Sequence, residues 1–347
     1  MNSFLRSGRL AADQVDAELL RRIANIGEES ANNSPDAASS ITFLRETSSQ
    51  HSQVSTYRIE TLSGPRYVVA KRIRDPQPGT LDFLQREYDA LQKIREVAGD
   101  SLAGTFPDAL LFSRKRIVLS MVAGVSLDKQ LKRTANVLTG WLSTRQMEKT
   151  GRQVAAWLGR FHELMRCDDV GHDHEKYAVE FGMLLPKCAP FGVAAATLRD
   201  VREAAFRLSH NLQSRSMPAA ASHGDFIPQN ILIHQGKVGV IDFASYSDRA
   251  PVYRDVAHFV GYLLLLGVKP IYAGKPLRVL ASSFLAAYPF PLDSALLRIF
   301  LIKALLRLIS DGEPVRTYMS RIRSGNLDNL LLRLTDEQKP LPFGIQF

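Results

Sequence analysis

The spacing of apolar residues changes along the chain and divides it into three parts. Apolar residues at helical spacing predict a helix over residues 12–27, and the Ser- and Asn-rich segment that follows, 28–40, is expected to be a linker. Apolar and polar residues then alternate with a period of two. This pattern predicts strands at 41–46, 54–62, 66–73, 106–112 and 116–121. Between the third and fourth strands, apolar residues return to helical spacing and predict a helix at 81–97.

Beyond Gly124 most apolar residues recur at helical spacing. The strand-like passage 219–243 interrupts this pattern, and the longest apolar stretch, 256–268, contains His258 and is shorter than the roughly 20 residues of a membrane span. That stretch is therefore expected to be a buried helix. The remaining helices are predicted at 126–133, 147–165 and 194–212, and over much of 255–332. The chain is thus predicted to be α+β, with a sheet-rich part at 41–122 and a helical part at 123–347.

The composition indicates which kinds of ligand the protein binds and in which cell compartment it is expected. The 347 residues are 45% apolar and 23% charged, as in ordinary folded proteins with two domains or lobes. The net charge of +9 is spread along the chain without aromatic interleaving, so it favours an anionic ligand over nucleic acid. Cys167 and Cys188 form no zinc signature, and no signal peptide or membrane span is evident. A cytoplasmic protein is expected.

Two passages concentrate residues that carry chemistry, Ser222–Ile233 and Val238–Ala244. Asp225 and Asn230 share a loop, and Asp242 ends an apolar strand. A turn at 234–237 would fold that strand back against 231–233, so the hairpin is expected to bring the three side chains to one edge. Two carboxylates and an amide are oxygen ligands suited to Mg²⁺, and one carboxylate can accept a hydroxyl proton.

These residues resemble a known family. The sequence His-Gly-Asp-Phe-x-Pro-x-Asn at 223–230, followed by Ile-Asp-Phe at 241–243, is similar to the aminoglycoside phosphotransferase-like family, which includes antibiotic, choline, homoserine and sugar kinases. The resemblance extends over about 40–310 and implies a two-lobed protein-kinase-like fold, with a small antiparallel-sheet N-lobe and a larger helical C-lobe. It implies ATP and Mg²⁺ as cofactors, Asp225 as the catalytic residue, and Asn230 and Asp242 as metal ligands.

The resemblance also predicts a lysine on the third strand that pairs with a glutamate on the next helix. Lys71 shares one face of the strand at 66–73 with Val69, and a lysine on this otherwise apolar face needs an anion. Glu87 lies on the inward stripe of the helix at 81–97, where an unpaired charge would be costly. A Lys71–Glu87 pair explains both, and Lys71, Glu87 and Val69 are predicted to belong to the nucleotide site.

Two further segments complete the predicted nucleotide site. The stretch 117–127 resembles the connector between lobes, so the backbone of Ser120, Met121 and Val122 is expected near the adenine. The loop at 47–52 should cover the phosphates. It contains no glycine, in contrast to the Gly-x-Gly-x-x-Gly of protein kinases, so Ser49 is expected to contact phosphate instead.

Two acidic positions are given structural interpretations. Asp255 near the start of a helix is expected to cap that helix or to brace the catalytic loop through His223. The alternating residues at 172–175, His-Asp-His-Glu, are interpreted as a solvated polar loop rather than a metal site.

The function predicted from these residues is an ATP- and Mg²⁺-dependent phosphotransferase that acts on a hydroxyl of a small molecule. Aminoglycoside, sugar and amino-alcohol acceptors remain open at this point, and the acids at 168–180 are candidates for an amine-binding pocket. A pseudokinase or nucleotide-binding scaffold is the alternative, supported by the glycine-free loop. A protein kinase ranks lower because no Ala-Pro-Glu segment follows Asp242 and little room is left for an activation loop.

Overall fold

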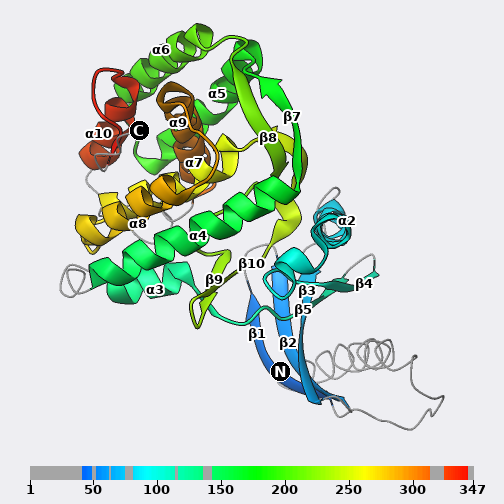
Figure 1. Ribbon diagram of the computed structural model, residues 1–347. Coiled ribbons are helices and arrows are strands. Elements are labelled where there is room, and N and C mark those ends of the chain that lie inside the picture. Colours follow the sequence, from blue (N-terminus) through cyan, green and yellow to red (C-terminus); the bar gives the residue numbers. More distant parts are fainter. Residues whose placement is uncertain are drawn as a thin grey trace, which may run out of the picture. The chain divides into compact units, whose positions relative to one another are not determined.

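The computed structural model describes residues 41–48, 52–61, 64–74, 81–113, 116–135, 143–312 and 324–342 (Figure 1). The predicted helix at 12–27, the linker at 28–40 and Ser49 lie outside these residues. The chain divides into two compact units. Within the described residues, the first unit comprises those up to 96 together with 106–122, and the second comprises 97–105 and those from 123 onward.

The first unit is a five-stranded antiparallel sheet and one helix. The strand order is β1-β2-β3-β5-β4, in which β1 (Ile41–Ser48), β2 (Ser52–Thr61), β3 (Gly64–Ile73), β4 (Ala109–Ser113) and β5 (Arg116–Ser120) follow the predicted sequence of elements. Helix α2 (Leu81–Ala98) lies between β3 and β4 in the chain. The predicted strand at 106–112 begins only at Ala109, because Pro107 has no N–H for the ladder and the chain bends there after a short 3₁₀ helix, η1 (Gly99–Leu102).

The segment 97–105 differs from the continuous lobe that was expected over 41–122. Thr105 bonds to residues of the second unit: its carbonyl accepts from the Val240 N–H at 2.7 Å, and its hydroxyl accepts from the Trp157 indole N–H at 3.0 Å. These contacts explain why the end of α2 and the turn after it belong with the second unit.

The second unit is mainly helical. Helices α4 and α8 lie side by side (Figure 1), and the close approach depends on Gly151, where a Cβ would come within 2.6 Å of the Leu280 carbonyl oxygen. The helices are α3 (Leu127–Thr134), α4 (Thr144–Leu164), α5 (His174–Cys188), α6 (Ala195–Asn211), α7 (Tyr253–Val268), α8 (Gly274–Ala287), α9 (Ser294–Ser310) and α10 (Ser324–Thr335).

Helix α7 contains the apolar stretch 256–268 and is buried along almost its whole length, as the sequence predicted. No helix among the described residues has the length and apolar character needed to cross a membrane.

Two small antiparallel sheets complete the second unit. One has the order β10-β9-β6, with β6 (Val125–Ser126), β9 (Ile231–His234) and β10 (Lys237–Val240). The other has the order β11-β8-β7, with β7 (Arg166–Gly171), β8 (Ser216–Ser222) and β11 (Ser247–Pro251). Gln235 and Gly236 both have positive φ in the two-residue turn between β9 and β10, which is the hairpin turn that the sequence indicated.

Helix α5 and strand β7 were not predicted. The segment 172–175 is not a solvated loop. His172 is buried, and its Nε2 lies 2.8 Å from the Ser209 hydroxyl oxygen. The Asp173 carboxylate accepts a hydrogen bond from the Lys176 N–H at 3.1 Å and caps α5, which begins at His174. Strand β7 was missed because its sequence, RCDDVG, has no apolar alternation and pairs with the more buried β8. Cys167 and Cys188 are both free thiols.

Candidate active site

The loop between β8 and β9 brings Asp225 and Asn230 into direct contact. The Asn230 side-chain amide donates to Asp225 Oδ2 at 2.9 Å and to the Asp225 backbone carbonyl at 3.0 Å. The Ile241 N–H donates to the Asn230 carbonyl at 3.0 Å, which ties the end of the loop to the residue before Asp242. The loop and the β9–β10 hairpin therefore converge, as their spacing in the sequence predicted.

Asp242 follows this hairpin in an unusual backbone conformation. Its φ of 69° and ψ of 67° lie in the left-handed region, which few residues other than glycine adopt, although Asp and Asn tolerate it best. Backbone strain of this kind concentrates at functional sites, because it redirects a side chain that regular structure would aim elsewhere.

Electrostatics link the two carboxylates. Burial raises the pKa of Asp225, and the negative charge of Asp242 raises it further, while the positive charge of Arg307 and the hydrogen bond from Asn230 act in the opposite direction. Asp242 follows Ile241, whose N–H bonds to Asn230, and Asn230 in turn bonds to Asp225, so the backbone ties both carboxylates to the same cluster. The predicted cluster of Asp225, Asn230 and Asp242 thus has a partly desolvated carboxyl group at its centre.

The His223 ring connects the two halves of this cluster. Its Nδ1 accepts the Asp225 backbone N–H at 3.2 Å, and its Nε2 lies 3.0 Å from the Ile241 carbonyl oxygen. A carbonyl can only accept, so Nε2 holds the proton and donates it, and the hydrogen bonds assign the neutral tautomer to His223. The ring also packs on Phe243 with a centroid distance of 4.5 Å.

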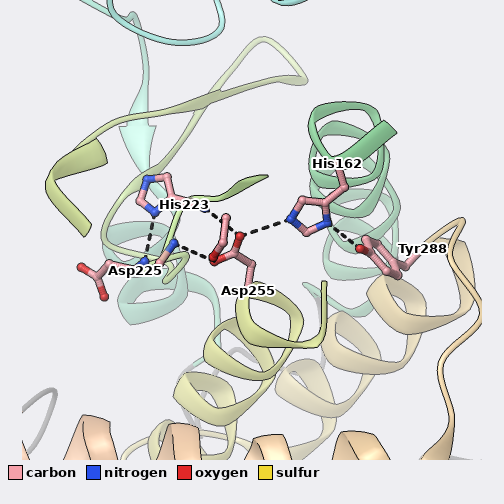
Figure 2. Close-up of polar contacts among 7 residues, drawn as sticks. His162, His223, Asp225, Asp255 and Tyr288 are labelled. Carbon is pink, nitrogen blue, oxygen red and sulfur yellow. Dashed lines mark hydrogen bonds and ion pairs between the residues drawn. The ribbon is translucent and has the colours of Figure 1, made fainter. Parts of the chain in front are cut away.

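The Asp255 carboxylate holds the start of the loop between β8 and β9, residues 223–230, which the sequence predicted to be the catalytic loop (Figure 2). It is fully buried, and it accepts hydrogen bonds from the His223 N–H at 2.8 Å, the Gly224 N–H at 2.8 Å and the Ser222 hydroxyl at 2.9 Å. The prediction that Asp255 braces the loop is confirmed. The brace runs through the backbone of His223 rather than its ring, and Asp255 lies within the first turn of α7 rather than at its N-cap.

Two residues that the sequence did not single out complete this brace. His162 of α4 has Nε2 3.2 Å from Asp255 Oδ2, and its Nδ1 lies 2.5 Å from the Tyr288 hydroxyl (Figure 2). Burial raises the pKa of Tyr288, so the phenol stays protonated and donates to Nδ1, while Nε2–H donates to the carboxylate. The one signal in the sequence is that His162 follows Leu158 by four residues on the buried face of α4.

The four donors around Asp255 keep it ionised. Burial alone would raise the pKa of Asp255, but the hydrogen bond from His162 and the positive charge of Arg254 help to hold the pKa below its ordinary range. A buried carboxylate is tolerated only when its lone pairs are satisfied, and here the donors come from three separate elements.

In the first unit, the predicted ion pair between Lys71 and Glu87 is present. Lys71 Nζ lies 2.8 Å from Glu87 Oε2, and the glutamate side chain is only 1% exposed. The stripe of α2 that carries Glu87 is buried as predicted, through Leu84, Leu91 and Ile94. The ion pair therefore offsets the cost of burying the lysine and the glutamate at inward positions on a strand and a helix.

The other residues predicted for the nucleotide site lie on the strands around this pair. Val69 is half-buried on β3, opposite Leu119 of β5. The Ser120 N–H donates to the Asp108 carbonyl and the Met121 N–H to the Tyr67 carbonyl. Within the described residues the Val122 N–H has no backbone partner of this kind.

The comparisons with known proteins identify the family of the chain. Residues 45–266, which run from within β1 to near the end of α7, match the sequence profile described as "Phosphotransferase enzyme family". The chain belongs to this family. The phosphotransferase activity predicted from the sequence is therefore the activity of its family, and the predicted resemblance is confirmed. No curated protein sequence matches the chain.

Solved structures of phosphotransferases share the fold at low sequence identity. A thermostable mutant of aminoglycoside phosphotransferase APH(4)-Ia, in a ternary complex with AMP-PNP and hygromycin B, matches with a TM-score of 0.57 and 12% identity over 88% of this chain and 97% of its own. Choline kinase from Cryptosporidium parvum Iowa II has a TM-score of 0.54 at 12% identity over 93% and 95% of the two chains, and a glucosamine kinase has 0.52 at 16% over 86% and 96%. The two-lobed protein-kinase-like fold is thus confirmed.

The close packing at Gly224 gives a first prediction. Gly224 has a φ of 81°, and a Cβ there would lie 2.0 Å from the Ser245 carbonyl oxygen, so we expect Gly224→Ala to displace the loop and abolish phosphotransfer. Gly192→Ala is the matched control, because its φ is 85° but nothing lies within 4 Å of a Cβ. Urea unfolding should show a loss of about 1–2 kcal/mol for the control and more for Gly224→Ala. If Gly224→Ala and Gly192→Ala lost the same stability and Gly224→Ala still transferred phosphate, close packing at Gly224 would not be required.

The buried ion pair of the first unit gives a second prediction. We expect Lys71→Met to destabilise the protein by roughly 3–5 kcal/mol, because it leaves the Glu87 carboxylate buried without its cation. The double variant Lys71→Met, Glu87→Met should recover most of that stability in urea unfolding. If both residues also serve the nucleotide, the double variant will still bind Mg·ATP poorly by calorimetry. Wild-type nucleotide affinity in the double variant would show that Lys71 and Glu87 do not contribute to nucleotide binding.

Proposed function

We propose that the chain transfers the γ-phosphoryl group of ATP to a hydroxyl of a small molecule in a Mg²⁺-dependent reaction. The observation that supports this most directly is the contact of Asp225 with Asn230 beside Asp242, on a loop whose backbone is fixed by Asp255. Phosphoryl transfer needs little covalent chemistry from a protein, and positioned carboxylates and cations supply most of its catalysis.

The donors beside Asp225 fit a magnesium ion. The amide nitrogen of Asn230 is engaged by Asp225, so its oxygen is the atom left to act as a ligand, and Asp242 offers a carboxylate. The described residues contain no group of three or more His, Cys, Asp and Glu residues that would enclose a metal. Mg²⁺ is commonly held by one or two protein oxygens together with substrate phosphates, and such an ion would neutralise phosphate charge when bound.

Asp225 is the proposed proton acceptor. Its Oδ2 already accepts from Asn230, which orients the carboxylate and leaves Oδ1 for the hydroxyl proton of the acceptor. The acceptor oxygen then forms the new bond to phosphorus as the bond to ADP breaks. A carboxyl group whose pKa is raised by burial is a stronger base than an exposed one, which suits this role. Lys71, held by Glu87, is proposed to bind the nucleotide phosphates.

The alternatives have less support. A scaffold or pseudokinase would not need a strained Asp242 and a buried brace beneath Asp225. A protein kinase would need an open segment between Asp242 and α7. Here that interval is filled by the 3₁₀ helix η4 (Phe243–Ser245) and by β11, which pairs with β8.

Two carboxylate variants separate binding from transfer. We expect Asp225→Asn to bind Mg·ATP with an affinity close to wild type but to lose transfer by about 10²–10⁴-fold, because the proton acceptor is gone. Asp242→Asn should bind ATP equally with and without Mg²⁺, because it lacks a metal ligand. Calorimetry with ATP, repeated after removal of Mg²⁺ with EDTA, and ³¹P NMR on pooled sugars, amino sugars and amino alcohols measure the two effects.

Asp200→Asn on the exposed face of α6 is the control, because it removes the same charge away from the site. Full transfer by Asp225→Asn would reject the proposed base. A failure of the wild-type protein to bind Mg·ATP would reject the proposed ATP-dependent reaction, and Mg·ATP binding without transfer to any pool would favour the nucleotide-binding scaffold.

A further inference from the structure

A cavity of about 280 Å³ in the second unit is not used by the roles assigned so far. It lies among α5, β11, α7 and α9. Its volume is slightly below the range of about 300–1,000 Å³ for small-molecule pockets, so it suits a molecule of monosaccharide size. Its charged lining consists of Lys176, Glu180, Arg249, Arg254, Lys303 and Arg307.

The lining of this cavity is strongly cationic. It holds five side chains that carry positive charge and only one carboxylate, Glu180, which forms an ion pair with Lys303. Burial lowers the pKa of Lys303 and of Arg254, which reflects the cost of crowding these cations in a partly desolvated space. Cations gathered in a concave site attract an anionic ligand, because the low dielectric of its walls focuses their field.

Arg254 connects the cavity to the catalytic loop. Its guanidinium lies so close to Gly224 that a Cβ there would come within 2.8 Å of Nη2. Among the described residues no carboxylate forms an ion pair with Arg254, although it is half-buried. The charge of Arg307, from the same lining, is near enough to Asp225 to lower the pKa of that carboxyl group. The cationic cavity and the proposed proton acceptor are therefore neighbours.

The wall of the cavity also holds an unsatisfied polar atom. His258 is only 5% exposed, and its Nδ1 is buried without a hydrogen-bond partner in the described structure. Burial, together with the positive charge of Arg307, lowers the pKa of His258 to about 3, so the ring is neutral. A buried polar atom without a partner is costly, and a ligand hydroxyl or phosphate oxygen in the cavity would satisfy it.

Three of the acids that were candidates for an amine-binding pocket, Asp169, Asp173 and Glu180, have other partners. Asp173 caps α5, and Glu180 is neutralised by Lys303. The Asp169 carboxylate accepts from the Ser216 hydroxyl at 3.4 Å on the exposed edge of β7, and the backbone carbonyls of Asp168 and Asp169 accept from the Arg249 guanidinium at 3.3 Å. A polycationic aminoglycoside would meet like charge in the cavity beside Asp225.

We propose that the acceptor of this phosphotransferase is a monosaccharide-sized alcohol that already carries an anionic group, a phosphate or a carboxylate, and that this cavity binds that group. Arg254 and Arg307 hold the anion, because guanidinium groups match the geometry of phosphate and carboxylate oxygens. The hydroxyl to be phosphorylated then points toward Asp225. This assignment of the substrate class rests on the proposed function, but the binding of an anion does not require turnover.

The binding test uses inorganic phosphate as the probe. Phosphate is titrated into the full-length protein, first alone and then with the nucleotide site saturated by Mg·AMP-PNP, while NMR follows the arginine Nε–H resonances. We expect a saturable shift of the Arg254 resonance under both conditions. Arg307→Gln should weaken phosphate binding by about tenfold or more, because a charged hydrogen-bond partner is lost. Arg278→Gln, on the exposed face of α8, removes the same charge outside the cavity and should bind phosphate as wild type does.

Either of two results would overturn the proposal. One is the absence of a saturable shift at Arg254, and the other is an equal loss of affinity in Arg278→Gln and Arg307→Gln. The rates of phosphoryl transfer to glucose 6-phosphate, glucose and glucosamine then compare an anionic, a neutral and a cationic acceptor. Faster transfer to glucosamine than to glucose 6-phosphate would also reject the proposal of an anionic acceptor. Failure of Mg·ATP binding alongside intact phosphate binding would count against the kinase and not against the cavity.

Discussion

The structure of the second unit depends on the buried carboxylate of Asp255. A fully buried carboxylate is stable only if its oxygen atoms accept hydrogen bonds. Those of Asp255 accept from two backbone N–H groups, a hydroxyl and an imidazole. The two backbone donors belong to the loop that carries Asp225. The hydrogen bonds that stabilise the Asp255 carboxylate therefore also fix the position of the proposed base. His162 and Tyr288 extend the same network into α4 and the end of α8, which makes the catalytic loop part of the core.

The charges of the second unit are separated in a way that fits two different ligands. Asp225 and Asp242 form a negative edge with oxygen donors, where a divalent cation and its phosphates would be expected. Beside it, the cavity lined by Arg254 and Arg307 is positive and suits an anion. An acceptor held by its anionic group would therefore be attracted to one side of Asp225 while the metal lies on the other. In the proposed reaction, selection for acceptor charge would therefore take place next to the reacting hydroxyl.

The sequence predicted those parts of the site that local geometry controls. Asp225, Asn230 and Asp242 are joined by a short loop and a tight hairpin, so their convergence follows from turn residues and spacing. The Lys71–Glu87 pair was implied by the family resemblance and agrees with the periods of a strand and a helix. His162, Tyr288 and the cationic cavity were not predictable in the same way. His162 and Tyr288 are separated by 126 residues, and they meet only because α4 packs against α8, as decided by small residues such as Gly151. The predicted strand at 106–112 was too long at its start, because Pro107 cannot donate a ladder hydrogen bond although the apolar pattern continues through it.

The claim that Asp255 fixes the catalytic loop is tested most directly by hydrogen exchange of individual amides. In the wild-type protein, the His223 and Gly224 amides should exchange as slowly as the Val240 amide, which bonds to Thr105 in the same unit. In Asp255→Asn, the account predicts that the His223 and Gly224 amides exchange much faster while Val240 keeps its protection relative to global unfolding, because an amide replaces part of the acceptor with a donor. Unchanged protection of His223 and Gly224 in that variant would contradict the account.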